Sequence, residues 1–125
     1  MNVVHVRGLV KRFGPFTALD GVDLDVADGE SVGLIGPNGC GRTTLLQIVA
    51  ALRTATAGTI EVAGVDARRF PVQARASALY IDGEPYGSSR MTVKEYLAFA
   101  ATARHRGDGA PAMASVDAVI ERAQL

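Results

Sequence analysis

The sequence has little that would commit the chain to a membrane, an oxidising compartment or a charged polymer. Its only cysteine, Cys40, cannot form an internal disulfide, which fits a reducing cytoplasm. No apolar run approaches the roughly 18 residues of a membrane-spanning helix, and Met1 to His5 lacks a secretory pattern. The 13 basic and 13 acidic residues cancel, so no net field attracts nucleic acid or an anionic membrane. We expect a soluble protein of at most one domain.

A glycine-rich stretch at residues 36–44 is the part of the sequence that points to chemistry. The spacing Gly36-x-x-x-x-Gly41-Arg42-Thr43 meets the phosphate-loop pattern G-x-x-x-x-G-K-[ST] at every defined position but one, because Arg42 replaces lysine. Its glycines let successive backbone N–H groups converge on one point, which suits a polyanion such as phosphate.

The segments on either side of this stretch give it the context that the pattern requires. Ser31 to Ile35 is mostly apolar and bounded by turn residues, which predicts a buried parallel strand. Leu45 to Leu52 is apolar on nearly all faces, which predicts a buried helix whose N-terminus points its positive dipole end at the same phosphates. The alternative is an ordinary glycine-rich turn between a strand and a helix.

Alternating polar and apolar residues predict an antiparallel β portion over residues 1–30. Its strands would be Val3–Val10 and Val22–Val26, with a loop at Lys11–Phe16 that carries two aromatic side chains. One of these could lie flat on a purine, a contact worth roughly 1–3 kcal/mol in base-stacking systems. An aromatic side chain folded onto the core is an equally good interpretation.

Residues 31–82 are predicted to form the core around the phosphate loop. Gly58–Gly64 has the composition of a short outer strand closed by turns. Arg68–Ser77 is predicted to contain a short helix with Pro71 in its first turn, and Ala78–Ile81 to be a second buried strand.

Residues 91–125 are predicted to be helical. Thr92 and Glu95 have the spacing of a capping box, which predicts a helix from Val93 to about Arg104. A glycine-rich break follows, and apolar residues at helical spacing then predict a final helix; they are Met113, Val116, Ile120 and Ala123.

Short motifs follow one another along the chain: Phe13-Gly14, Ala18 to Val22, Gly29-Glu30, Gly36 to Leu46, and Thr92 to Leu97. Together they resemble the ATPase subunits of ATP-binding-cassette (ABC) transporters. Each motif is weak alone, but their order and spacing are specific. The resemblance implies an α/β P-loop NTPase fold, with an N-terminal antiparallel β portion, an incomplete parallel core sheet with flanking helices, and the start of a helical subdomain.

The resemblance also implies a site for ATP and Mg²⁺. Phe13 would stack on adenine where the family usually carries tyrosine, and Thr43 would give its hydroxyl to Mg²⁺. Glu84 or Asp82 would be a further candidate metal ligand. The other nucleotide-binding residues would be Gly36, Asn38, Gly39, Cys40, Gly41, Arg42 and Thr44.

At the level of function, the resemblance implies an ATP-binding subunit that drives a membrane permease and pairs with a second ATP-binding subunit. Such a subunit lies in the cytoplasm, on the inner face of the cell membrane. The family hydrolyses ATP, and we expect no nucleic-acid partner and no transmembrane segment in this chain.

Three departures from the family pattern limit the expected function: they concern hydrolysis, coupling to the membrane partner and the completeness of the site. Arg42 keeps the charge of the family's lysine but not its compact shape, so binding should survive better than hydrolysis, unless the arginine only reflects an arginine-rich composition. The family's glutamine position is Gly83 here, with Glu84 next to it. The LSGGQ-type segment, catalytic glutamate and switch histidine have no secure counterpart before Leu125, which suggests the front half of a longer product or a marginally stable remnant.

Two other functions are compatible with the same residues. A degenerate, non-catalytic nucleotide-binding module would share the phosphate loop and differ at Arg42. A small autonomous P-loop kinase or NTPase would use Asp82, after the apolar run, to hold Mg²⁺ opposite Thr43. The histidines are more simply explained as a strand residue, His5, and a solvated helix-end residue, His105, than as ligands or switches.

Overall fold

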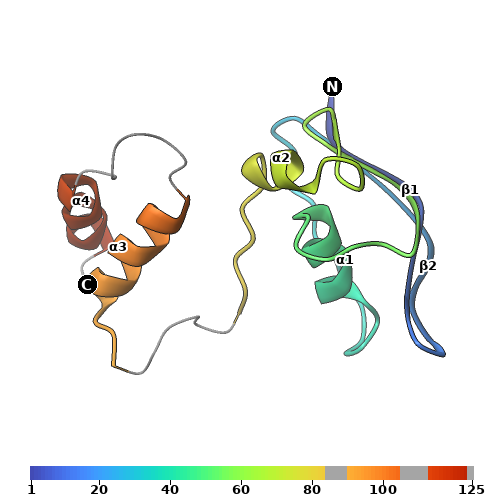
Figure 1. The fold of residues 1–125 in the computed structure, drawn as a ribbon, viewed down its shortest axis with the longest axis horizontal. Helices are drawn as coiled ribbons and strands as arrows, with labels where there is room; N and C mark the ends of the chain where they lie inside the picture. Colours follow the sequence, from blue (N-terminus) through green and yellow to red (C-terminus); the bar gives the residue numbers. More distant parts are fainter. Residues whose placement is uncertain (84–89, 105–112, 124–125) are drawn as a thin grey trace. The chain divides into compact units, whose positions relative to one another are not determined.

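The computed structural model describes residues 1–83, 90–104 and 113–123 (Figure 1). The chain divides into two compact units, Met1–Ile81 and Asp82–Leu125. Glu84 and His105, to which the sequence analysis assigned roles, lie outside the described residues. No helix in the described part of the chain is long and apolar enough to cross a membrane.

A four-stranded antiparallel sheet with the order β2-β1-β3-β4 is the frame of the first unit. Its strands are β1 (Asn2–Phe13), β2 (Phe16–Ala27), β3 (Ala57–Val62) and β4 (Val65–Asp66). The predicted N-terminal antiparallel pair is confirmed, and both strands are longer than expected. The residues predicted to form a loop instead continue the strands to a tight turn at Gly14 and Pro15, so that Phe13 and Phe16 are the last pair of the hairpin.

β3 lies inside the sheet, between β1 and β4, so its prediction as an outer strand was wrong. Gly58 makes the close pairing with β1 possible. Its φ of 93° is unfavourable for other residues, and a Cβ at this position would come 2.5 Å from the carbonyl oxygen of Gly8.

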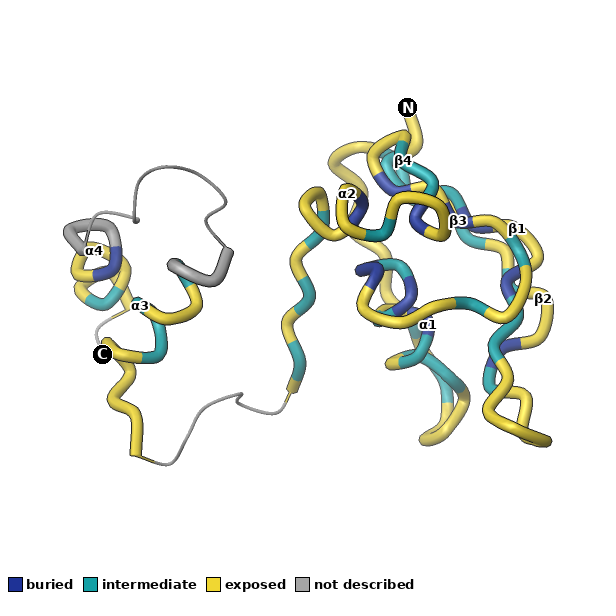
Figure 2. Tube along the Cα trace, in the orientation of Figure 1, coloured by how far each residue is buried: buried dark blue, intermediate teal, exposed yellow. Residues whose placement is uncertain are grey.

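Two short helices, α1 (Arg42–Val49) and α2 (Pro71–Ala76), pack on one face of this sheet (Figure 1). Pro71 occupies the first turn of α2, as predicted, where a missing N–H costs nothing. Figure 2 shows buried positions where α1 and the strands face each other, and full burial of a side chain such as Leu9 or Ile48 contributes about 1.5–3 kcal/mol. The core consists of Val6, Leu9, Leu19, Leu45, Ile48, Ala51, Ile60, Val62, Ala67 and Ala74.

Two segments predicted as buried parallel strands, Ser31–Ile35 and Ala78–Ile81, have no regular secondary structure. Their side chains are not buried either, since Ile35 is 97% exposed and Ile81 is 81% exposed. Both segments have the composition of central strands. A strand forms only when a neighbour shares its backbone hydrogen bonds, however, and no described strand pairs with either segment.

The helix after the glycine-rich stretch is less buried than its composition predicts. Leu45 and Ile48 face the core, but Leu46 is 47% exposed. The helix also ends at Val49, so that Leu52 lies beyond it. A helix packed on one sheet buries one stripe only, whatever the composition of its other faces.

The hairpin of β1 and β2 carries a cluster of charges on its exposed side. Arg7 donates a hydrogen bond of 2.6 Å to one carboxylate oxygen of Asp25, and Nδ1 of His5 lies 2.6 Å from the other. The bond from Arg7 is the main cause that holds the pKa of Asp25 below its ordinary value, and the same bond raises the pKa of Arg7. His5 is therefore a strand residue with a carboxylate partner.

The second unit contains α3 (Val93–Arg104) and α4 (Met113–Ala123), which confirms both predicted helices. α3 begins with the predicted capping box. The backbone N–H of Thr92 donates to Oε2 of Glu95 at 2.8 Å, and the N–H of Glu95 donates to the Thr92 hydroxyl at 3.3 Å. The first of these bonds is the main reason why the pKa of Glu95 is lowered.

The two helices of the second unit are joined by a salt bridge and by packing. Nζ of Lys94 on α3 lies 2.7 Å from Oδ1 of Asp117 on α4. Val116, from the predicted apolar stripe of α4, is only 5% exposed. This unit therefore has stabilising contacts of its own.

Candidate functional site

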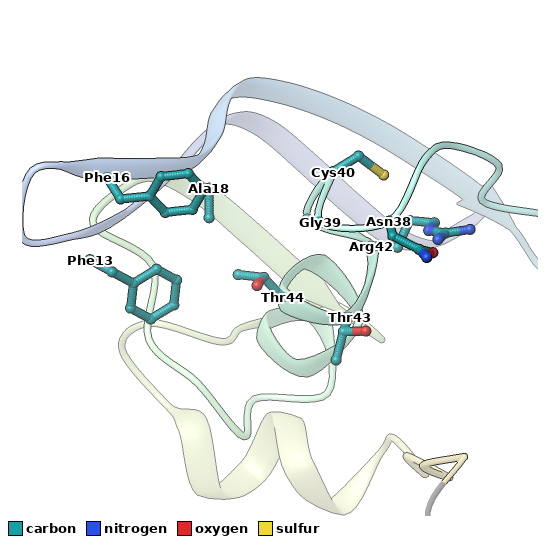
Figure 3. A pocket seen from close by; sticks show the side chains of 10 residues that line it. Phe13, Phe16, Ala18, Asn38, Gly39, Cys40, Arg42, Thr43 and Thr44 are labelled. Carbon is teal, nitrogen blue, oxygen red and sulfur yellow. The ribbon is translucent and has the colours of Figure 1, made fainter.

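A cleft of about 310 Å³ is formed where the tip of the β1–β2 hairpin meets the glycine-rich stretch and the start of α1 (Figure 3). The structure thus brings the predicted aromatic residue, Phe13, to the same cleft as the predicted phosphate loop. Gly36 is not among the lining residues, but it packs beside one of them, since a Cβ at Gly36 would come 2.7 Å from the sulfur of Cys40. The lining consists of Phe13, Phe16, Ala18, Asn38, Gly39, Cys40, Gly41, Arg42, Thr43 and Thr44.

Gly41 determines how the glycine-rich stretch enters α1. It adopts the left-handed conformation, with φ 97°, and is the N-cap residue of the helix. A Cβ here would come 2.6 Å from the carbonyl oxygen of Ala18 and 2.8 Å from the side chain of Leu19, both on β2. Its own carbonyl accepts the first helical hydrogen bond, from the N–H of Leu45 at 2.9 Å. Glycine therefore lets the loop lie directly against the hairpin.

The start of α1 is suited to an anion. No side chain of the described residues caps this helix, and its first turn contains no acidic residue. The N–H groups of a first helical turn lack intrahelical acceptors, and the helix dipole places partial positive charge there. Arg42, in the same turn, adds a full positive charge. These features together favour a bound phosphate.

The cleft has a cationic side and an aromatic side. In Figure 3 the side chains of Asn38 and Arg42 lie together, and the rings of Phe13 and Phe16 lie on the opposite side of the cleft. Phe13 is 40% exposed and Phe16 is 59% exposed, so both residues are accessible to a ligand. A ligand with an anionic end and a flat apolar end would complement this arrangement.

Thr43 and Thr44 both carry hydroxyls in the cleft, and the Mg²⁺ role predicted for Thr43 stays a prediction. Thr43 is exposed in the first turn of α1, next to the N–H groups at the start of the helix. Mg²⁺ is usually bound through one or two protein oxygens together with substrate phosphates, so one hydroxyl is an adequate protein contribution. Asp82 belongs to the second unit, where its Oδ1 accepts a hydrogen bond of 2.8 Å from the N–H of Gly83. Its metal role stays a prediction.

Some residues in and beside the cleft were not predicted from the sequence. Phe16 was visible only as the second of two aromatic candidates in the predicted loop, and Ala18 only as part of a family motif without a role in a site. The cations beside Phe13 were also missed: Nζ of Lys11 lies 5.0 Å from the ring centroid, and the guanidinium carbon of Arg53 lies 5.2 Å from it. Strand alternation could have placed Lys11 on the same side as Phe13.

Comparison with protein families and curated proteins gives a consistent result. The family model described as ABC transporter matches residues 19–125. The sulfate/thiosulfate import ATP-binding protein of Bordetella pertussis is 47% identical over 104 residues, which are 82% of this chain and 29% of the relative. That of Methylococcus capsulatus is 40% identical over 109 residues, which are 86% of this chain and 31% of the relative. The chain thus spans less than a third of the length of these relatives.

Solved structures show the same fold. The structure of an ATP-binding subunit of an ABC transporter is 28% identical, with a TM-score of 0.71 over 85% of this chain and 44% of that chain. A dimeric ATP-binding cassette in a post-hydrolysis state with ADP and Pi is 20% identical, with a TM-score of 0.81 over 98% of this chain and 57% of that chain; it is evidence for the fold alone. The predicted α/β P-loop NTPase fold class is confirmed, but the described residues form an antiparallel sheet and not the predicted parallel core sheet.

Proposed function

Because the chain belongs to the ABC transporter family, we propose that its cleft binds ATP with Mg²⁺ and that the chain is the ATP-binding part of a transporter subunit. The observation that carries the proposal is the cleft itself. It combines the uncapped N-terminus of α1 and the cation of Arg42 with the exposed ring of Phe13. This is the complement of a molecule with phosphates at one end and a purine at the other.

Each part of the cleft has a role in the proposed complex. Phe13 stacks on the adenine, the N–H groups of the loop and of the first turn of α1 hold the phosphates, and Arg42 neutralises their charge. Mg²⁺, once bound, would neutralise phosphate charge, and Thr43 is the residue that would contact it. The contacting loop residues are Gly39, Cys40 and Gly41, with Asn38 and Thr44 at the two ends.

The names of the curated relatives support the proposed role in a transporter. The curated relatives are named import ATP-binding proteins for sulfate and thiosulfate, which favours an importer for this chain as well. We propose that it acts with a transmembrane permease and a second ATP-binding subunit, on the cytoplasmic face of the cell membrane. Those partner chains would determine which molecule is transported.

A non-catalytic nucleotide-binding module is the second candidate, and Arg42 favours it. A guanidinium keeps the positive charge of lysine but places it on a planar fork of donors, which alters the alignment with a reacting phosphate. The candidate that used Asp82 as the end of a metal-binding strand loses its support, because Ala78–Ile81 is not a strand.

The test of ATP binding uses the full chain with Mg²⁺ in isothermal titration calorimetry. We expect ATP to bind, and Arg42→Ala to weaken binding about ten- to hundredfold, the range for one hydrogen bond to a charged group. Arg69→Ala is the matched control, since Arg69 is an exposed arginine outside the cleft. No ATP binding by the unmodified chain, or equal loss in both variants, would contradict the proposal.

A further inference from the structure

Two cations lie over the aromatic ring at the mouth of the cleft. Nζ of Lys11 is 5.0 Å from the centroid of the Phe13 ring, and the guanidinium carbon of Arg53 is 5.2 Å from it. Both distances are within the roughly 6 Å at which a cation is attracted to the face of an aromatic ring. Lys11 belongs to β1, and Arg53 follows α1, so the ring contacts one residue of its own strand and one residue of the segment after α1.

Both cations are themselves held in place by hydrogen bonds. Nζ of Lys11 donates to the carbonyl oxygen of Thr54 at 2.8 Å, and Nε of Arg53 donates to Oε1 of Gln47 at 2.9 Å. Gln47 is a residue of α1, the helix whose first turn forms the anion site. The Arg53 guanidinium therefore connects the aromatic ring to that helix.

The backbone supports the same connection. The N–H of Thr56 donates to the carbonyl oxygen of Val10 at 2.8 Å, and the N–H of Arg12 donates to the hydroxyl of Thr56 at 3.0 Å. The segment that carries Arg53 is thus tied to β1 directly beside Phe13. These backbone bonds fix the strand but not the Phe13 side chain, whose ring is contacted by the two cations.

We propose that Lys11 and Arg53 are positioning residues that hold the Phe13 ring in a fixed orientation relative to the phosphate loop. This proposal rests on the proposed ATP site. It adds that the two cations hold the ring in its base-binding orientation before the base arrives. The ring of a 40% exposed residue near a hairpin tip would otherwise have to be ordered when the base binds, and that ordering would reduce the affinity for the base.

The first test needs no ligand. The sequence contains no tryptophan, so Phe13→Trp introduces a single fluorophore that keeps an aromatic face for the cations. In this background we expect Arg53→Met and Lys11→Met each to increase acrylamide quenching of the tryptophan and to lower its anisotropy. Arg69→Met is the control, because Arg69 makes the same kind of contact with Phe70, at 5.8 Å, outside the cleft. Unchanged quenching and anisotropy in both variants would overturn the proposal, whether or not the chain binds ATP.

The second test separates the base from the phosphates. In the chain with native Phe13, Arg53→Met should weaken binding of ATP about two- to fivefold, the range for an exposed cation–aromatic contact, and leave the affinity for inorganic tripolyphosphate unchanged. Arg53→Lys, which keeps the charge, should restore ATP affinity. In a Phe13→Ala chain, Arg53→Met should have no further effect. Two results would show that Arg53 has a merely structural role. One is an equal loss of affinity for ATP and for tripolyphosphate in Arg53→Met, and the other is an effect of Arg53→Met on ATP affinity that is as large in the Phe13→Ala chain as in the native chain.

The two hypotheses fail in different ways. If the unmodified chain binds neither ATP nor tripolyphosphate, the proposed function fails, and the quenching experiment alone decides whether the cations hold the ring. If ATP binds with equal affinity to the native chain and to the Arg53→Met and Lys11→Met variants, the proposed function stands and the positioning role is wrong.

Discussion

Gly41 meets two separate requirements at the start of α1. Its left-handed backbone conformation directs the chain into the helix, and its missing side chain leaves room for the carbonyl of Ala18. At Gly39 only the backbone requirement applies. Its φ is also positive, at 81°, but a Cβ there would meet no atom within 4 Å. The two glycines therefore allow backbone strain and steric contact to be distinguished.

We predict that Gly41→Ala lowers the free energy of unfolding of the first unit by about 1–3 kcal/mol from backbone strain alone, and by more because of the contact with Ala18. Urea unfolding followed by circular dichroism measures this change. Gly39→Ala is the control with strain but without the contact, so its loss should be smaller. A loss at Gly39 equal to or greater than that at Gly41 would show that the contact with β2 has no energetic importance.

The local motif of the site could be predicted from the sequence, but its long-range contacts could not. The phosphate loop is visible in the sequence because its residues are consecutive and their spacing is constrained by one ligand. The contact of Arg53 with Phe13 joins residues far apart in the chain, so no local spacing indicates it. Phe16 reaches the cleft only because the hairpin is longer than its hydrophobic pattern suggests.

Helices and hairpins were predicted well because their hydrogen bonds are local. The α3 capping box and the antiparallel pairing of β1 with β2 each follow from neighbouring or alternating residues. The strands predicted at Ser31–Ile35 and Ala78–Ile81 are different. Their apolar composition shows that they would suit a sheet, but it does not show which strands they would pair with. The described residues supply no such partner, and the segments remain irregular.

The charge cluster on the β1–β2 hairpin makes the stability of the first unit depend on pH in the acid range. The pKa of Asp25 is lowered, first by the hydrogen bond from Arg7 and then by that from His5, so the folded state favours the ionised carboxylate. The resulting stabilisation is fully present above the ordinary pKa of 3.8, and it is lost as the pH falls through the lower folded value. We expect Asp25→Asn to lower the melting temperature at neutral pH, and this difference from the unmodified chain to disappear in the acid range below pH 3.8.

A matched variant for this measurement lies on the same strand. Asp20 is an exposed aspartate of β2, and its replacement by asparagine should leave the melting temperature nearly unchanged at every pH. A difference between Asp25→Asn and the unmodified chain that persists unchanged in acid would contradict the assignment, because the protonated carboxyl could not be the cause.

All residues that line the cleft belong to the first unit, Met1–Ile81. Binding of a nucleotide should therefore depend on that unit. Hydrolysis requires more, because a water molecule must be oriented and activated beside the phosphate, in general by a carboxylate, glutamine or histidine. Among the residues that the structure describes, those that line the cleft include no acid and no histidine.

We therefore predict that the chain alone binds ATP but has no measurable steady-state turnover, and that Arg42→Lys does not create any. Lysine would improve the fit to the phosphates, but it would not supply a group that activates water. Release of phosphate over hours with ATP and Mg²⁺ in excess measures the rate, and Arg42→Ala serves as the control for contaminating hydrolase. Turnover that Arg42→Ala leaves unchanged is not due to this cleft, whereas turnover that Arg42→Ala strongly reduces or abolishes would show that the cleft is catalytic without partners.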